Sequence, residues 1–165
     1  MNTSTSLEFK KSGGAFQTIL LGGLVAGILD ATDGVVTYYL AFRMNPIQVL
    51  QYIASGAFGA ASFEGGLYTA LAGLVFHFFI SFSVAAFFYF ASKVIPWLRE
   101  HFVVSGLFYG AAVYCVMNYL VLPLSAVAPS AFSLALFLNG LLGHALFVGL
   151  PIAWLASRSG NAASQ

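Results

Sequence analysis

Four ionisable side chains lie inside long apolar stretches of this sequence, where a lipid bilayer would normally exclude them. Asp30 and Asp33 fall in the first stretch, His77 in the second and His144 in the fourth. An ionisable residue near the bilayer centre costs about 2.5–3.5 kcal/mol on insertion scales, so such residues face a partner, a cavity or a cofactor instead of lipid. We therefore predict that these four residues form a buried polar centre.

This polar centre is compatible with three kinds of chemistry. Chains of Asp and His carry protons in membranes, which favours a centre that handles a proton, an ion or a small polar solute. The same groups could instead fix helix register through hydrogen bonds, in a non-catalytic structural or assembly partner of a membrane complex. As a third alternative, His77 and His144 could ligate a b-type haem from opposite helices, or all four residues could hold a divalent metal such as zinc.

The composition sets the class of protein. The chain has 165 residues, of which 60% are hydrophobic and 7% are charged, whereas a soluble domain has about 25% charged residues. Such a chain cannot cover a water-facing surface, so we predict a single integral membrane domain whose main partner is the lipid bilayer. The net charge of +1 gives no reason to expect nucleic acid. A homo-oligomer or a membrane-complex partner remains open.

Four apolar stretches are long enough to cross a bilayer, which takes about 20 residues. They predict an all-α, four-span transmembrane helical bundle that forms one domain over 15–158, between cytoplasmic tails at 1–14 and 159–165. The predicted spans are 15–42, 67–94, 102–122 and 134–157.

A short additional helix is predicted between the first two spans. Asn45 is a good N-cap, and Pro46 suits the first helical position. The helix should cover about 46–58, which is too short to span the bilayer. It is expected to lie on the outer interface, or to dip into the membrane as a re-entrant segment that lines a site.

Basic residues predict the orientation, because cytoplasmic loops are enriched in Lys and Arg. Both termini and the loop between the second and third spans are therefore expected in the cytoplasm, and connections 43–66 and 123–133 outside. Five basic residues fall on the first side and Arg43 alone on the other; the five are Lys10, Lys11, Lys93, Arg99 and Arg158.

Glycine patterns indicate close helix packing and a possible duplication. The first and third spans each contain Gly-x-x-x-Gly, which lets helix backbones approach in lipid or forms a dimer face. The second and fourth spans each contain Gly-Leu-x-x-His, ending at His77 and His144. The repeated order predicts two duplicated hairpins with equivalent histidines. The Gly-x-x-x-Gly residues are Gly23 and Gly27, and Gly106 and Gly110.

The remaining polar residues have secondary roles in this prediction. Glu64 lies at the outer end of the second span, and Asn118 and Asn139 lie in the outer halves of the third and fourth. The sequence has no Ser/His/Asp arrangement, nucleotide-binding glycine loop or HExxH pattern. It therefore offers no catalytic residue and no support for an enzyme.

Short motifs carry a family resemblance. They are Leu-Gln-Tyr-Ile-Ala-Ser-Gly at 50–56, Glu-Gly-Gly at 64–66, the run 74–78 around His77, Met-Asn-Tyr at 117–119 with Leu-Pro-Leu-Ser at 122–125, and Gly-Leu-Pro-Ile at 149–152. With them, the stretch 27–158 resembles a group of small, uncharacterised bacterial inner-membrane proteins. Its layout is also similar to that of the YagU-like proteins, with one histidine in a middle span and a Gly-His in the last. The resemblance implies a bacterial inner membrane and no particular activity.

Overall fold

The computed structural model describes residues 14–159, and this part of the chain is helical without a β-strand. The predicted tails, including Lys10 and Lys11, lie almost wholly outside the described residues. The elements are α1 (Gly14–Phe42), α2 (Pro46–Phe58), the 3₁₀ helix η1 (Gly59–Phe63), α3 (Gly66–Val94), α4 (Trp97–Glu100), α5 (Phe102–Val116), the π-helix η2 (Met117–Val121), α6 (Leu122–Leu124), α7 (Leu134–Gly143), the π-helix η3 (His144–Gly149) and α8 (Leu150–Arg158).

Four helices are long and apolar enough to cross a membrane: Gly14–Phe42, Gly66–Val94, Phe102–Leu124 and Leu134–Arg158. Their ends lie within two residues of the predicted ends. The four-span, all-α prediction is confirmed. The third span is α5, η2 and α6 in sequence, and the fourth is α7, η3 and α8.

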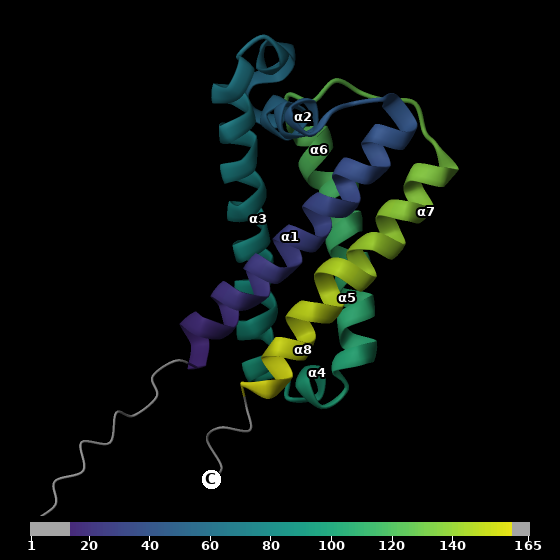
Figure 1. The fold of residues 1–165 in the computed structure, drawn as a ribbon. Helices are drawn as coiled ribbons and strands as arrows, with labels where there is room; N and C mark the ends of the chain where they lie inside the picture. Colours follow the sequence, from purple (N-terminus) through teal and green to yellow (C-terminus); the bar gives the residue numbers. More distant parts are fainter. Residues whose placement is uncertain (1–13, 160–165) are drawn as a thin grey trace, which may run out of the picture.

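The bundle consists of two hairpins that meet along α1 and the fourth span (Figure 1). In the first hairpin α1 packs on α3, and in the second α5 packs on η3 and α8. Helices α2 and α6 lie at one end of the bundle and α4 lies at the other (Figure 1). We call these the α2 end and the α4 end.

Both Gly-x-x-x-Gly faces are used inside this chain. A Cβ on Gly23 would lie 2.9 Å from the Cα of Phe82 in α3, and one on Gly106 would lie 2.9 Å from the Cα of Leu150 in α8. Only glycine permits such backbone approach. The Gly106 face therefore packs within its own hairpin, and is not left free for a dimer.

The hydrophobic core occupies the half of the bundle toward the α4 end. Small residues of α1, α3 and α8 surround Phe88, which is 1% exposed. The hydroxyl of Tyr109 in α5 donates a 2.7 Å hydrogen bond to the carbonyl of Val84 in α3, which joins the two hairpins at this level. Packing therefore fills the centre of this half of the bundle, and a groove of about 460 Å³ lies beside it between α3, α4 and α5. The buried cluster is Ala26, Ala85, Phe88, Val148, Ile152, Ala153 and Ala156.

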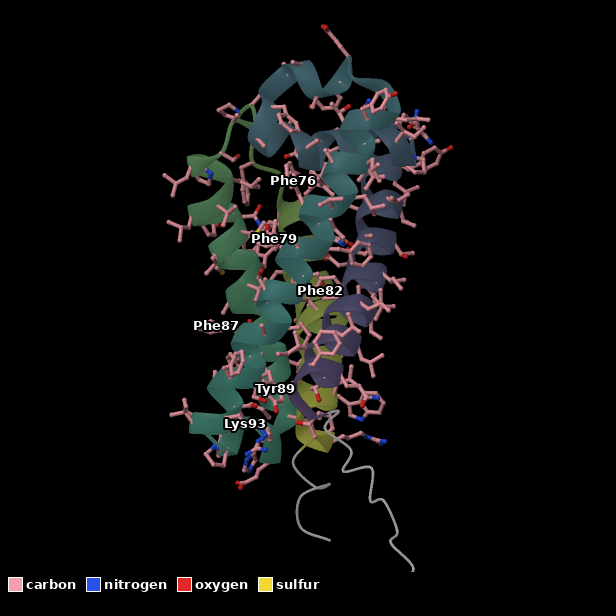
Figure 2. All side chains as sticks on the ribbon, turned by 90° about the vertical axis from the view of Figure 1, so that its left-hand side faces the viewer. Phe76, Phe79, Phe82, Phe87, Tyr89 and Lys93 are labelled. Atoms are coloured by element: carbon pink, nitrogen blue, oxygen red, sulfur yellow. The ribbon has the colours of Figure 1, made fainter. Side chains whose placement is uncertain are left out.

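The outer surface of the bundle is apolar, as expected for a protein in lipid. Phe79 and Phe87 on α3 are each 69% exposed, and Lys93 follows them at the α4 end (Figure 2). A soluble monomer rarely exposes apolar patches of this extent. With its four spans, the chain is an integral, multi-pass membrane protein.

Helix α2 is the short helix predicted over 46–58, and it docks tightly on α3. The Asn45 side chain accepts from the Gln48 backbone N–H at 3.0 Å, and the Gln48 side chain accepts from the Asn45 backbone N–H at 2.9 Å, which is a capping box. Gln51 is 4% exposed, and its amide donates to the carbonyl of Gly66 at 3.0 Å. The helix is therefore held against the α2 end of α3.

The two π-helices have a cause in the sequence. Pro123 and Pro151 carry no backbone N–H, so neither can donate to the carbonyl four residues earlier. The π-helices Met117–Val121 and His144–Gly149 each end two residues before one of these prolines. Single-turn π segments often occur at functional sites. Residues of both π segments line a cavity in the bundle.

Candidate functional site

A cavity of about 760 Å³ lies in the half of the bundle toward the α2 end. Its walls come from all four spans, and α2 and the connection 127–133 form its outer cover. The backbone N–H of Ala126 donates to the carbonyl of Gly56 at 2.9 Å, which ties the connection to α2. Residues 128–132 both line the cavity and are exposed, so the cavity opens near this connection.

The four ionisable residues predicted from the sequence all line this one cavity: Asp30, Asp33, His77 and His144. The sequence predicts that these four residues are buried. This prediction is wrong, because each of them is partly exposed. The side chains of Asp30 and His144 are 25% and 22% exposed. The physical reason is that α3 and α5 contribute the walls of an open cavity at this level instead of packing on each other.

Asp30 and His144 come closest to a direct pair. Nδ1 of His144 lies 3.7 Å from Oδ1 of Asp30, and it donates to the carbonyl of Gly140 at 2.9 Å. A carbonyl only accepts, so Nδ1 carries a proton. Within residues 14–159, no group donates a hydrogen bond to the Asp30 carboxylate. Its oxygens are therefore available to a ligand.

Asp33 has a different environment, because Asn139 of α7 holds it. The Asn139 amide donates to Oδ2 of Asp33 at 3.1 Å and to the hydroxyl of Thr37 at 2.9 Å. A Cβ on Gly143 would lie 2.7 Å from the same Oδ2, so a larger residue at this position would displace the carboxylate from its present place. These contacts fix the register between α1 and the fourth span.

His77 is bonded to the backbone of α1. Its Nε2 donates to the carbonyl of Gly27 at 2.8 Å, and the Ser81 hydroxyl donates to the carbonyl of Gly23 at 2.7 Å. His144 by contrast bonds to its own helix. The two histidines therefore make different contacts and are not equivalent in the structure. Both hairpins do pack through their Gly-x-x-x-Gly faces. The duplication stays a prediction.

The secondary polar residues divide into two groups. Asn118 and Asn139 line the cavity, and the Asn118 amide donates to the carbonyl of Tyr114 at 3.0 Å. Glu64, which is exposed, is not among the lining residues.

The sequence gives no clear signal for the aromatic part of the wall, because Tyr and Phe are frequent throughout a chain of this composition. Tyr38, Tyr52, Tyr114 and Phe137 line the cavity. The rings of Tyr38 and Tyr52 lie 5.2 Å apart, and those of Tyr114 and Phe137 lie 5.7 Å apart in an edge-to-face arrangement.

The side chains do not fit the haem or metal alternatives. His77 would have to ligate haem iron through Nε2, the nitrogen usual for this role, yet that nitrogen donates to the Gly27 carbonyl. Over residues 14–159, no group of three or more His, Cys, Asp or Glu side chains is placed to hold a metal ion. Asp33 is directed to Asn139, and His77 is directed to α1 backbone.

No protein-family model, no curated protein and no solved structure matches this chain. The resemblance to small inner-membrane proteins stays a prediction.

Proposed function

We propose that this chain is a membrane protein that handles a proton, an ion or a small polar solute in the cavity at the α2 end. The observation that carries this proposal is the Asp30 carboxylate, which lines a cavity of about 760 Å³ and receives no hydrogen bond from residues 14–159. A carboxylate kept in a membrane helix without a protein donor is costly, so it is retained for something that enters the cavity.

The two aspartates have different roles in this proposal. Asp30 faces the cavity beside His144 and interacts with what enters. Asp33 is held by Asn139 and positions α1 against the fourth span. The structural alternative inferred from the sequence thus applies to Asp33, while Asp30 is the residue that acts on the solute.

The shape of the cavity favours loading from one side. The lining residues lie toward the α2 end, and the packed cluster around Phe88 closes the bundle toward the α4 end. Release on the other side would need α3 or the fourth span to move, as in alternating access. The prolines and π segments give the third and fourth spans points at which they can bend.

We further propose that the α2 end faces outward and the α4 end faces the cytoplasm, in a bacterial inner membrane. Lys93, Arg99 and Arg158 lie on elements at the α4 end, while Arg43 follows α1 at the α2 end. This distribution agrees with the enrichment of basic residues in cytoplasmic loops.

Flux through reconstituted vesicles tests the proposal. The purified protein is inserted into liposomes that contain a pH-sensitive dye, and proton movement is followed after a pH jump, with and without Na⁺ or small amines outside. We expect flux above that of empty liposomes, and we expect Asp30→Asn to abolish it with an unchanged elution profile and helix content. Glu64→Gln, a carboxylate change outside the lining, is the matched control and should retain flux. Full flux in Asp30→Asn would show that the assignment of Asp30 is wrong.

A further inference from the structure

The ionisable groups of the cavity are two carboxylates and two imidazoles, those of His77 and His144. Asp30 and Asp33 supply two carboxylates, and neither Lys nor Arg is among the described residues that line it. Anions and phosphates are usually bound by Arg or Lys, which this lining lacks, and each of its two histidines already donates a ring N–H to a backbone carbonyl. The cavity therefore has the chemistry of a site for a cation.

The size of the cavity and the distribution of its oxygens distinguish between kinds of cation. Metal ions such as Ca²⁺ and Mg²⁺ need about six or more oxygen ligands that converge at 2.0–2.6 Å. Asp33 instead accepts from the Asn139 amide, and within residues 14–159 no group of three or more His, Cys, Asp or Glu side chains is placed to hold a metal ion. A volume of about 760 Å³ is in the range of sites for organic molecules, about 300–1,000 Å³.

Aromatic rings line the same cavity as the Asp30 carboxylate. The ring of Tyr114 lies 5.4 Å from that of His144, whose Nδ1 lies 3.7 Å from Asp30. Tyr38 and Tyr52 form a second aromatic pair on the wall that α1 and α2 contribute. Aromatic faces attract ammonium groups, and quaternary ammonium ions are bound by cages of such rings.

From this combination, and resting on the proposed function, we infer that the cavity binds a small organic ammonium ion. Asp30 supplies the counter-charge, and the rings of Tyr38, Tyr52 and Tyr114 contact the alkyl groups on nitrogen. A lipid headgroup also contains an ammonium group, but it brings a phosphate, and the described lining has neither Lys nor Arg to pair with it. The ligand is therefore a free organic ammonium ion and not a phospholipid headgroup.

Three related probes test this inference by isothermal titration calorimetry. They are choline, its uncharged carbon analogue 3,3-dimethyl-1-butanol, and phosphocholine, each titrated into the full chain in dodecyl maltoside, a detergent without an ammonium group. We expect choline to bind about tenfold or more tightly than the uncharged analogue, since a desolvated cation–π contact and a counter-charge are each strong enough for such a factor. Phosphocholine should bind more weakly than choline.

Two variants connect binding to the residues named. Asp30→Asn should weaken choline binding about tenfold or more and leave the analogue unaffected, whereas Glu64→Gln should bind choline as the wild type does. Tyr52→Leu, on the separate helix α2, should weaken choline binding about fivefold to tenfold. Because it leaves the spans unchanged, it keeps the test valid if Asp30→Asn fails to fold.

The outcomes separate this inference from the proposed function. Equal binding of choline and the uncharged analogue would overturn the ammonium inference while leaving a cavity that takes polar solutes. Phosphocholine bound as tightly as choline would also overturn it, in favour of a lipid headgroup. Absence of choline binding in a protein that still shows Asp30-dependent proton flux would overturn the inference alone. Absence of both would overturn the inference and the proposed function together.

Discussion

Replacing Gly110 with alanine tests the packing that positions His144. A Cβ at Gly110 would lie 2.6 Å from the carbonyl carbon of His144 and from the Cα of Ala145, both backbone atoms of η3. Ordinary carbon contacts lie near 3.5–4.0 Å, so α5 and η3 must separate by roughly 1 Å. Such overpacking costs typically about 1–3 kcal/mol, and we expect the upper part of that range because neither backbone can rotate away.

Gly34→Ala is the matched control, because nothing lies within 4 Å of a Cβ at Gly34. Both changes gain the same helix propensity, about 0.5–1 kcal/mol, so the difference between the two variants measures the clash alone. We expect Gly110→Ala to be less stable than Gly34→Ala by about 3 kcal/mol, measured by reversible unfolding in mixed micelles of increasing SDS fraction. Gly110→Ala should also reduce flux, because a displaced η3 moves His144 away from Asp30. Equal stability of the two variants would show that the glycine contact between α5 and η3 is not as close as described.

Three further changes test individual contacts. Asn139→Ala removes two interhelical hydrogen bonds, one of them to Asp33. It should destabilise the bundle by about 1 kcal/mol in the same unfolding assay. An unchanged unfolding midpoint would argue against a positioning role for Asn139. Gln51→Leu removes the donor to the Gly66 carbonyl. It should increase amide hydrogen exchange in α2 without changing exchange in the spans. Unchanged exchange in α2 would mean that apolar packing alone holds α2 against α3. Asn45→Ala removes the N-cap of α2 and should cost about 1 kcal/mol, seen as faster exchange confined to its first turn; faster exchange spread over the whole helix would contradict a local cap.

Most of the fold follows from the composition of the sequence and from the residues that start and end its helices. Apolar runs longer than a bilayer is thick define the four spans, and Asn45-Pro46 defines the start of α2. These signals are local, and a bilayer requires each span to satisfy its own backbone hydrogen bonds. The predicted span ends therefore lie within two residues of the observed ends.

The candidate site could be predicted only in part. Ionisable residues within spans are conspicuous, which is why Asp30, Asp33, His77 and His144 were found and do line one cavity. Their individual partners depend on helix rotation, and a helical pattern does not fix that rotation. Sequence alone therefore cannot distinguish the roles of the two aspartates. Asp30 faces the cavity, whereas Asp33 is held by Asn139.

The prediction that these four residues are buried is wrong for a related reason. Depth in a membrane indicates that a residue avoids lipid, but it does not distinguish a packed interior from a cavity. The cavity depends on long-range packing: α2 docks on α3, and the connection 127–133 covers the space beside it. Aromatic lining residues such as Tyr52 were not identified, because Tyr and Phe also fill the lipid-facing surface.

The most direct test of the central claim is whether water-soluble cations reach the cavity from the α2 end. Ile80 of α3 lines the cavity, and Cys115, the one cysteine of the sequence, is exposed on α5 and absent from the lining. Ile80→Cys in a Cys115→Ser background is treated in intact vesicles with a membrane-impermeant, positively charged methanethiosulfonate, and with its negatively charged counterpart. We expect the cysteine at position 80 to react with the cationic reagent faster than with the anionic one, and Cys115 of the wild type not to react. A cysteine at position 80 that reacts with neither reagent until the protein is denatured would contradict a water-filled, cation-accepting cavity.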